Sequence, residues 1–209
     1  MSSFAVFVTA KPTPKALNRA LLLIQDFEFG EYPQDSNWTL LTSKELPASA
    51  PATTLPVSDI RDSNGFAGMS FSEINKFVRA NEEALKDISL SSGDWLIIDQ
   101  KGFETSTCLV VEQVYDYGEE DDDDDGGGEG GLTDEFRACR IPYEEAHSMV
   151  VNLDIANMGF EDWVDEDAGE QEDGAWKWRS FGQDPTDDDE VVAKRRAALQ
   201  QLRDAGYAD

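Results

Sequence analysis

Negative charge is concentrated in the second half of this chain. Residues 91–209 hold 9 Lys and Arg against 33 Asp and Glu, a net charge of -24 within a total of -27 for all 209 residues. Like charges on one compact body repel each other, so these carboxylates must lie at the surface or beside cations. The fold must therefore place an acidic face on its C-terminal half, and function is expected there.

Size and composition favour a folded soluble protein. With 40% apolar residues the chain can bury a core, and no apolar run is long enough to cross a membrane. The N-terminal residues, Met1-Ser2-Ser3-Phe4, do not form a charged and then apolar leader. Cys108 and Cys139 lie in apolar segments. Buried free thiols, a reducing compartment and a cytoplasmic location are therefore expected.

The acidic balance also excludes classes of partner. The chain lacks the basic surface that would displace counterions from nucleic acid or bind an anionic membrane. No dinucleotide or phosphate-binding fingerprint is present, because the glycines at 126–128 and 130–131 follow acids that would repel phosphate. No nucleic acid, membrane or cofactor is expected.

The first half of the chain predicts alternating strands and helices. Residues 4–8 are a short apolar, β-prone run, and Thr13-Pro14 opens a helix expected over 14–27. A second strand is expected over 38–42. Ser70-Phe71-Ser72-Glu73 has the pattern of a capping box, which begins another helix.

The second half continues this alternation. Strands are expected over residues 95–98, 107–115, 136–141 and, at an edge, 176–178. Helices are expected from Pro142 onward, over 160–164 and over 191–206, with Gly206 as the stop of the last one. The order of the elements predicts an α/β fold, with α+β as the alternative, built on a central mixed sheet flanked by helices.

The domain organisation follows from these elements. Residues 1–181 are expected to form a single domain, with flexible loops at about 43–56 and 116–131. An acidic linker over 182–190 then leads to the C-terminal helix, 191–206.

The most acidic run, residues 119–125, precedes three glycines, and neither a helix nor a strand is expected there. A calcium loop counted from Asp121 would have Asp123 and Asp125 at its third and fifth positions and glycine at its sixth. Its twelfth position is Leu132 rather than the glutamate that a calcium loop needs. A solvated loop and no metal site are therefore expected.

The region from Trp95 onward carries a family resemblance. The segments concerned are Trp95-Leu96-Ile97-Ile98-Asp99, Cys108-Leu109-Val110-Val111, Phe136-Arg137-Ala138, residues 149–160 and Trp163. In this order they resemble a family of small acidic proteins, known mostly from bacteria and classified as a domain of unknown function. The most specific stretch is residues 152–160 (NLDIANMGF), and the best coverage is 95–181. The resemblance implies one compact α/β domain and no particular reaction. The acidic glycine loop, the loop at 43–56 and the final helix depart from the family pattern.

Four side chains are candidates for an enzyme or small-molecule site. Asp99 ends an expected central strand, where ligands bind in open α/β sheets. His147 is the sole histidine, and Asp154 and Asn157 lie in the family-like stretch together with Asn152. The simpler interpretation is that the short polar side chains cap helices and fill turns, while His147 is a partly exposed helix residue without a nucleophile motif.

Acids and tryptophans are interleaved near the end of the expected domain. The acids are Glu161, Asp162, Asp165, Glu166, Asp167, Glu170, Glu172 and Asp173, and the tryptophans are Trp163, Trp176 and Trp178. Aromatic rings among carboxylates could hold a basic partner. The alternative, which we favour for the rings, is that they pack inward while the acids face water.

The leading hypothesis is therefore a non-enzymatic binding protein whose acidic half engages a basic protein or toxin. Its binding residues would be Glu161, Asp162, Trp163, Asp165, Glu166, Asp167, Trp176 and Trp178. The alternative is an enzyme or small-molecule binder with a pocket near Asp99, His147, Asp154 and Asn157. A third interpretation is that the charge serves only solubility.

Overall fold

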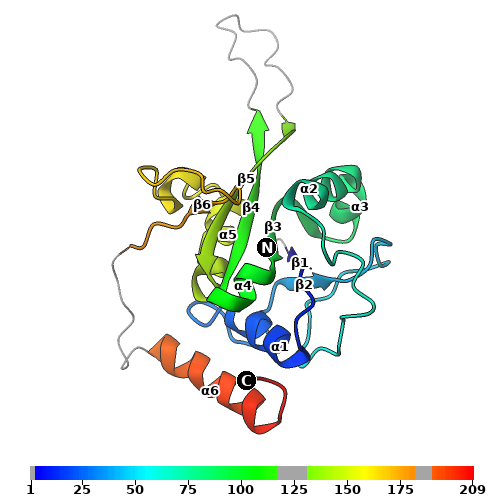
Figure 1. Ribbon diagram of the computed structural model, residues 1–209, viewed down its shortest axis with the longest axis vertical. Helices are drawn as coiled ribbons and strands as arrows, with labels where there is room; N and C mark the ends of the chain where they lie inside the picture. The colour runs from blue at the N-terminus through cyan, green and yellow to red at the C-terminus, as the bar shows by residue number, and fades with distance from the viewer. Residues whose placement is uncertain (1–2, 117–130, 182–189) are drawn as a thin grey trace, which may run out of the picture.

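The computed structural model describes residues 3–116, 131–181 and 190–209. They form one six-stranded mixed sheet with helices on both faces (Figure 1). The strands are β1 (Ser3–Val8), β2 (Trp38–Leu41), β3 (Leu90–Ile98), β4 (Thr107–Asp116), β5 (Gly131–Pro142) and β6 (Trp176–Lys177). The α-helices are α1 (Pro14–Leu23), α2 (Phe71–Ala80), α3 (Glu82–Asp87), α4 (Gln100–Thr105), α5 (Ala146–Asp154) and α6 (Glu190–Asp204). Two 3-10 turns are η1 (Tyr143–Glu145) and η2 (Phe160–Trp163). The predicted α/β class is confirmed.

The sheet has the order β2-β1-β3-β4-β5-β6 and combines two kinds of pairing. β1 pairs in parallel with both β2 and β3, as strands joined by helical crossovers do. β4 is antiparallel to both β3 and β5, and β6 is a short parallel edge strand on β5. The parallel half and the antiparallel half thus meet at β3.

Side chains that alternate along the central strands belong to two separate hydrophobic cores, one on each face of the sheet. Leu96 and Ile98 on β3 belong to the cluster that includes residues of α1 and α5, whereas Trp95 and Ile97 belong to the cluster with α2 and α3. Figure 1 shows α2 and α3 together on one side of the sheet, away from α5. Because both faces of β1 and β3 are covered, residues 4–8 of β1 and 95–98 of β3 are continuous apolar runs.

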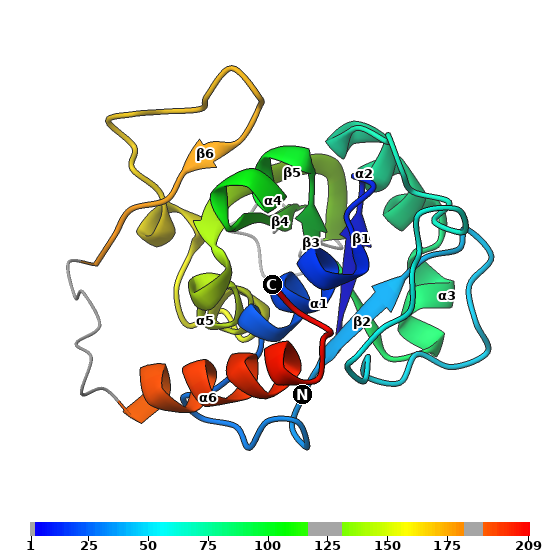
Figure 2. The same cartoon turned by 60° about the horizontal axis from the view of Figure 1, so that its bottom comes forward.

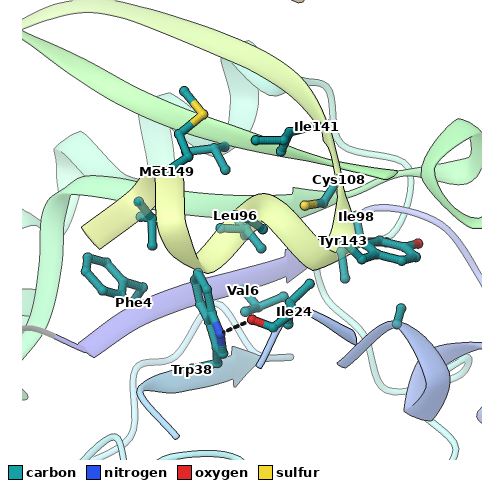
Figure 3. Close-up of a cluster of buried hydrophobic side chains, with 14 of the residues drawn as sticks. Phe4, Val6, Ile24, Trp38, Leu96, Ile98, Cys108, Ile141, Tyr143 and Met149 are labelled. Atoms are coloured by element: carbon teal, nitrogen blue, oxygen red, sulfur yellow. Dashed lines mark hydrogen bonds between the residues drawn. The ribbon is translucent and has the colours of Figure 1, made fainter. Parts of the chain in front are cut away.

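One tryptophan links α1 to the edge of the sheet. The buried indole of Trp38 on β2 donates a hydrogen bond from Nε1 to the carbonyl oxygen of Ile24, 2.7 Å away (Figure 3). The Trp38 ring also lies 5.6 Å from that of Phe4 on β1. The end of α1 is therefore held against β2 by a side chain that is itself part of the core.

The beginning of α1 follows the prediction and its end does not. Thr13 caps the helix by accepting a hydrogen bond from the Ala16 amide, and proline occupies the first turn. The helix stops at Leu23 rather than residue 27. Asp26 explains the earlier end, since its Oδ1 accepts hydrogen bonds from the amides of Glu28 and Phe29 and forms a local turn.

Other helix and strand boundaries also differ from those expected from the sequence. Pro142 is the last residue of β5, and the helix begins at Ala146 after one 3-10 turn. β3 begins at Leu90, so Gly93 and Asp94 lie inside a strand instead of before it. The six-residue helices α3 and α4 were not expected.

The segment expected as a loop over 43–56 has no helix or strand, but part of it lies along β2. Thr53 donates its amide to the carbonyl of Trp38 and accepts the amide of Leu40 at its side-chain oxygen, at 2.8 and 2.7 Å. These contacts cover the outer edge of the sheet. The acidic run at 119–125 and nearly all of the expected linker, 182–189, lie outside the described residues.

No helix in the described part of the chain is long and apolar enough to cross a membrane. The two cysteines are buried free thiols, as predicted.

Replacing Trp38 by Phe tests its bridging role. The variant leaves the buried Ile24 carbonyl without its donor, so the free energy of unfolding should fall by about 1–3 kcal/mol in urea titrations. Trp176→Phe is the control, because the Trp176 ring is only partly buried. Equal losses in the two variants would contradict a specific role for the Trp38 hydrogen bond.

Candidate functional site

The carboxylate at the carboxyl end of β3 is held by its neighbours. Asp99 caps α4 through a 2.7 Å hydrogen bond from the Gly102 amide to its Oδ1. Both of its oxygens also receive hydrogen bonds from Arg140 on β5, at 3.1 and 2.6 Å. Asp99 therefore lies where ligands bind in open sheets, but its oxygens are engaged in a cap and a two-pronged ion pair.

Arg140 connects this end of the sheet to the chain before β6. Its Nη2 lies 3.4 Å from an oxygen of Asp173, and the ammonium group of Lys101 lies 2.8 Å from the same oxygen. We call these four residues the Asp99–Arg140 cluster (Asp99, Lys101, Arg140 and Asp173). The cluster joins α4, β5 and the segment before β6 through charges of opposite sign.

His147 is in a different environment. Its Nε2 lies 3.4 Å from the side-chain amide nitrogen of Asn37, and its Nδ1 lies 4.0 Å from Oδ2 of Asp26. Its ring packs edge-to-face with that of Trp38. Burial lowers the pKa of His147, and the Asp26 carboxylate opposes this shift. His147 is thus a mostly buried residue at the junction of α5, β2 and the loop after α1.

Asn152 and Asn157, in the family-like stretch, serve a turn. Asn157 donates its side-chain amide to Oδ1 of Asn152 at 2.6 Å, and its backbone amide to the Asn152 carbonyl at 2.9 Å. These bonds close the chain after α5.

Asp154 lines an open hollow of about 520 Å³ with Lys86 and residues 89–93 at the beginning of β3. Asp154 and Asp99 therefore lie near opposite ends of β3, which spans about 25 Å at the usual rise per strand residue.

A row of charges crosses the sheet near that hollow, and the sequence interpretation did not include it. Asp94, Glu112 and Arg137 are direct partners on β3, β4 and β5. Two guanidinium nitrogens of Arg137 donate to Glu112, at 2.6 and 3.1 Å, and a third donates to Glu161. We call these residues the charged row (Asp94, Glu112, Arg137 and Glu161).

The charged row contains three acids and one base. Arg137 satisfies Glu112 and Glu161, and its guanidinium carbon also lies 4.6 Å from the ring centre of Phe160. Asp94 is only 7% exposed and has the charges of Glu112 and Asp154 nearby. Burial first, and these two carboxylates second, raise the pKa of Asp94 to about 8. Asp94 therefore holds a proton at neutral pH.

Alternation along β3 could have identified this acid. Asp94, Leu96 and Ile98 share one face of the strand, and the last two are core residues. The side chain of Asp94 must therefore point towards the interior. The identity of Arg137 as the cation of the row could not be predicted, because it depends on the register between β4 and β5.

The tryptophans among the C-terminal acids pack inward, as favoured from the sequence. Trp163 is 2% exposed and belongs to the core, and Trp176 and Trp178 are partly buried against the same cluster. Glu161 pairs with Arg137, Asp165 pairs with Lys177 at 3.0 Å, and Asp162 accepts the amide of Gly159. Another four acids of this region are exposed: Glu166, Asp167, Glu170 and Glu172.

Among the described residues no group of three or more His, Cys, Asp or Glu side chains is arranged to hold a metal ion. The calcium loop weighed at Asp121 lies almost entirely outside those residues.

The pKa of Asp94 predicts a pH-dependent stability difference. A raised native pKa stabilises the fold below the unfolded value, near 4, and this contribution is lost as the pH rises towards 8. Asp94→Asn, which stays neutral, should match the wild type near pH 4 and exceed its unfolding free energy by roughly 2–4 kcal/mol at pH 8. Urea titrations across this range measure the difference.

The control is Asp167→Asn, at an exposed carboxylate. It should leave the pH dependence unchanged. An Asp94→Asn protein that is less stable than the wild type at pH 8 would contradict the assignment of a protonated Asp94.

Comparisons with known proteins identify a family but no function. No curated protein and no solved structure matches the chain. A family model described as a domain of unknown function, DUF6924, matches residues 30–177, or 148 of the 209 residues. The matched range contains the charged row, the Asp99–Arg140 cluster and the stretch 152–160, and it leaves β1, α1 and α6 outside. The family resemblance read from the sequence is confirmed, and the chain belongs to the DUF6924 family of domains of unknown function.

Proposed function

We propose that this protein is a non-enzymatic binding protein that engages a cationic partner, such as a basic protein or toxin, through its acidic C-terminal half. The contact surface we assign is the 165–175 loop, the chain between η2 and β6. Its exposed carboxylates, Glu166, Asp167, Glu170 and Glu172, would meet Lys and Arg side chains of the partner.

One observation carries the proposal. Asp165 and Asp173, at the two ends of the loop, are neutralised by Lys177 and by Lys101 with Arg140. Glu166, Asp167, Glu170 and Glu172 form no ion pair with any of the described residues. Four exposed like charges on one short loop create a local negative potential that attracts a cationic surface and raises its association rate.

The loop also has a defined shape, which supports specific binding over mere solubility. The amide of Gln171 donates to the Ala175 carbonyl at 2.9 Å, and the Gln171 side chain donates to the carbonyls of Ala168 and Gly169. Isolated bridges join Val164 to Trp178 and Glu170 to Trp176. A loop fixed by such bonds loses little conformational freedom on binding.

In this proposal the tryptophans have a supporting role. Trp163, just before the loop, belongs to the buried core, and its ring lies edge-on to that of Phe181 with 5.1 Å between the ring centres, so it fixes the start of the loop to the domain. The acids, rather than the rings, would then contact the partner.

The alternative function, an enzyme or small-molecule binder, has less support. Asp99 is occupied by Arg140, His147 lies beside Trp38, and Asp154 lines the hollow at the other end of β3. A site that used all of these side chains would need them in one place.

We also propose a cytoplasmic location. Cys108 and Cys139 are free, buried thiols on adjacent strands, which suits a reducing compartment.

Charge neutralisation tests the contact surface. The variant Glu166→Gln/Asp167→Asn/Glu170→Gln/Glu172→Gln should bind cytochrome c, used as a basic probe protein, at least about tenfold more weakly than the wild type at low salt. Calorimetric titrations at several salt concentrations measure the affinity. Wild-type binding should weaken as salt rises, with a smaller salt dependence in the variant.

The matched control removes the same charge elsewhere. Glu31→Gln/Glu45→Gln/Asp62→Asn/Asp87→Asn changes four other exposed acids and alters the net charge by the same amount. It should keep most of the affinity. No binding at low salt, or equal losses in the two variants, would contradict the proposal.

A further inference from the structure

The C-terminal helix differs in charge from the rest of this acidic chain. α6 carries Lys194, Arg195, Arg196 and Arg203 against Glu190 and Asp204, which makes its net charge +2 in a chain of -27. It lies on the outside of the molecule, next to α1 (Figure 2). It also lies outside the range that the family model matches.

α6 contacts the domain through one face. The residues of this face are partly buried and recur at helical spacing: Val191, Val192, Arg195, Ala198, Leu199 and Leu202. Leu199 packs against the core cluster that includes α1. No residue of α6 is fully buried, in contrast to α1, where six of ten are. The helix is therefore docked on a finished surface and contributes no core residue.

Arg195 is the centre of the docked face. Its guanidinium carbon lies 5.5 Å from the ring centre of Phe27, and its Nη2 lies 3.4 Å from the carbonyl oxygen of Glu144. Burial raises the pKa of the neighbouring Glu145, and the charge of Arg195 opposes this shift. Glu28 adds a further negative charge near Glu145.

The surface beneath α6 thus combines an apolar strip with acids. We call it the α6 surface and define it by α1, Phe27, Glu28, Glu144 and Glu145. It is complementary to a helix with apolar residues at i, i+7 and i+10 and an arginine at i+3, as Val192, Leu199, Leu202 and Arg195 are spaced in α6. The helix α6, which covers this surface in the structure, has those properties.

We infer that the α6 surface is a docking site for a basic amphipathic helix of the cationic partner, and that α6 occupies this site as an intramolecular competitor. This inference rests on the proposed function and adds a second contact surface to it. The partner's helix and α6 exclude each other because both need the strip around Phe27.

The shallow docking of α6 allows it to be displaced from the α6 surface by another helix. A docked helix without buried residues opens locally at a lower free energy than the sheet, whose strands are covered on both faces. Because α6 belongs to the same chain, its effective concentration at the site is high. A competing helix from another molecule can bind only while the site is free, so its apparent affinity is the intrinsic affinity multiplied by the fraction of time that α6 is released. Releasing α6 should remove this penalty.

Native-state hydrogen exchange on the full-length wild-type chain tests the first requirement. The amides in the middle of α6 should exchange by local opening, at least about tenfold faster than the slowest amides of β3 and β4. Exchange of α6 only together with these strands would overturn the inference.

A labelled peptide of residues 190–209 tests the site itself. The full-length variant Val192→Asp/Leu199→Asp places two charges on the docked face and should release α6. It should bind the peptide at least about tenfold more tightly than the wild type, measured by fluorescence anisotropy at low salt. Ala197→Asp/Gln201→Asp is the matched control, because it adds the same charge on the exposed face of the helix, and it should behave as the wild type.

Two peptide variants define the chemistry. Arg195→Glu in the peptide should weaken its binding to the released protein at least about tenfold. Lys194→Glu, which makes the same charge change on the exposed side, should have a much smaller effect. Equal peptide affinity for all three proteins, or equal effects of the two peptide changes, would overturn the inference.

The outcomes separate this inference from the proposed function. If the 165–175 loop variant loses its affinity for cytochrome c while α6 release changes nothing, the inference fails and the function stands. Chain exchange between two copies would appear as a stable wild-type dimer in sedimentation that disappears in the Val192→Asp/Leu199→Asp variant, and this result would replace the partner's helix by a second copy.

Discussion

Burial of both faces of β1 and β3 decides where charge can lie in this molecule. The two strands are covered by α1 and α5 on one face and by α2 and α3 on the other, so residues 4–8 and 95–98 in the middle of the sheet are all apolar. The described acidic residues therefore lie mainly on helices, in loops, at strand ends and in the antiparallel half of the sheet. Asp94 is the exception inside β3, and it is accommodated by holding a proton.

Carboxyl groups are accommodated in three ways in this protein: by pairing with arginine, by protonation and by exposure to solvent. Some carboxylates on or directly after strands are paired with arginines, as Glu112 is with Arg137 and Asp99 with Arg140. A buried carboxyl without a cation stays neutral, because desolvation of its charged form would be more costly than protonation. Other described carboxylates, including Glu166, Asp167, Glu170 and Glu172 of the 165–175 loop, face solvent, where screening by salt weakens their mutual repulsion.

The sequence was sufficient for features that depend on neighbours along the chain. The capping box at Ser70 and Glu73, the Thr13 cap and the stop at Gly206 all rest on local backbone chemistry, and the α/β class followed from the alternation of element types. The arrangement of the candidate site was harder to predict from the sequence. That Asp99 caps a helix was weighed from the sequence, but its partnership with Arg140 depends on how β5 is placed in the sheet, 41 residues further along. The early end of α1 was missed for a related reason, since helical periodicity continues past Leu23 and only the turn formed by Asp26 interrupts it.

The Asp99–Arg140 cluster has a consequence for recognition. Asp173 connects the end of the 165–175 loop to α4 and β5 through two cations, while Lys177 holds its beginning through Asp165. The loop is therefore tied to the domain at both ends, which restrains the backbone positions of its exposed acids. In the proposed function, a partner would then be selected by the spacing of its positive charges as well as by its net charge.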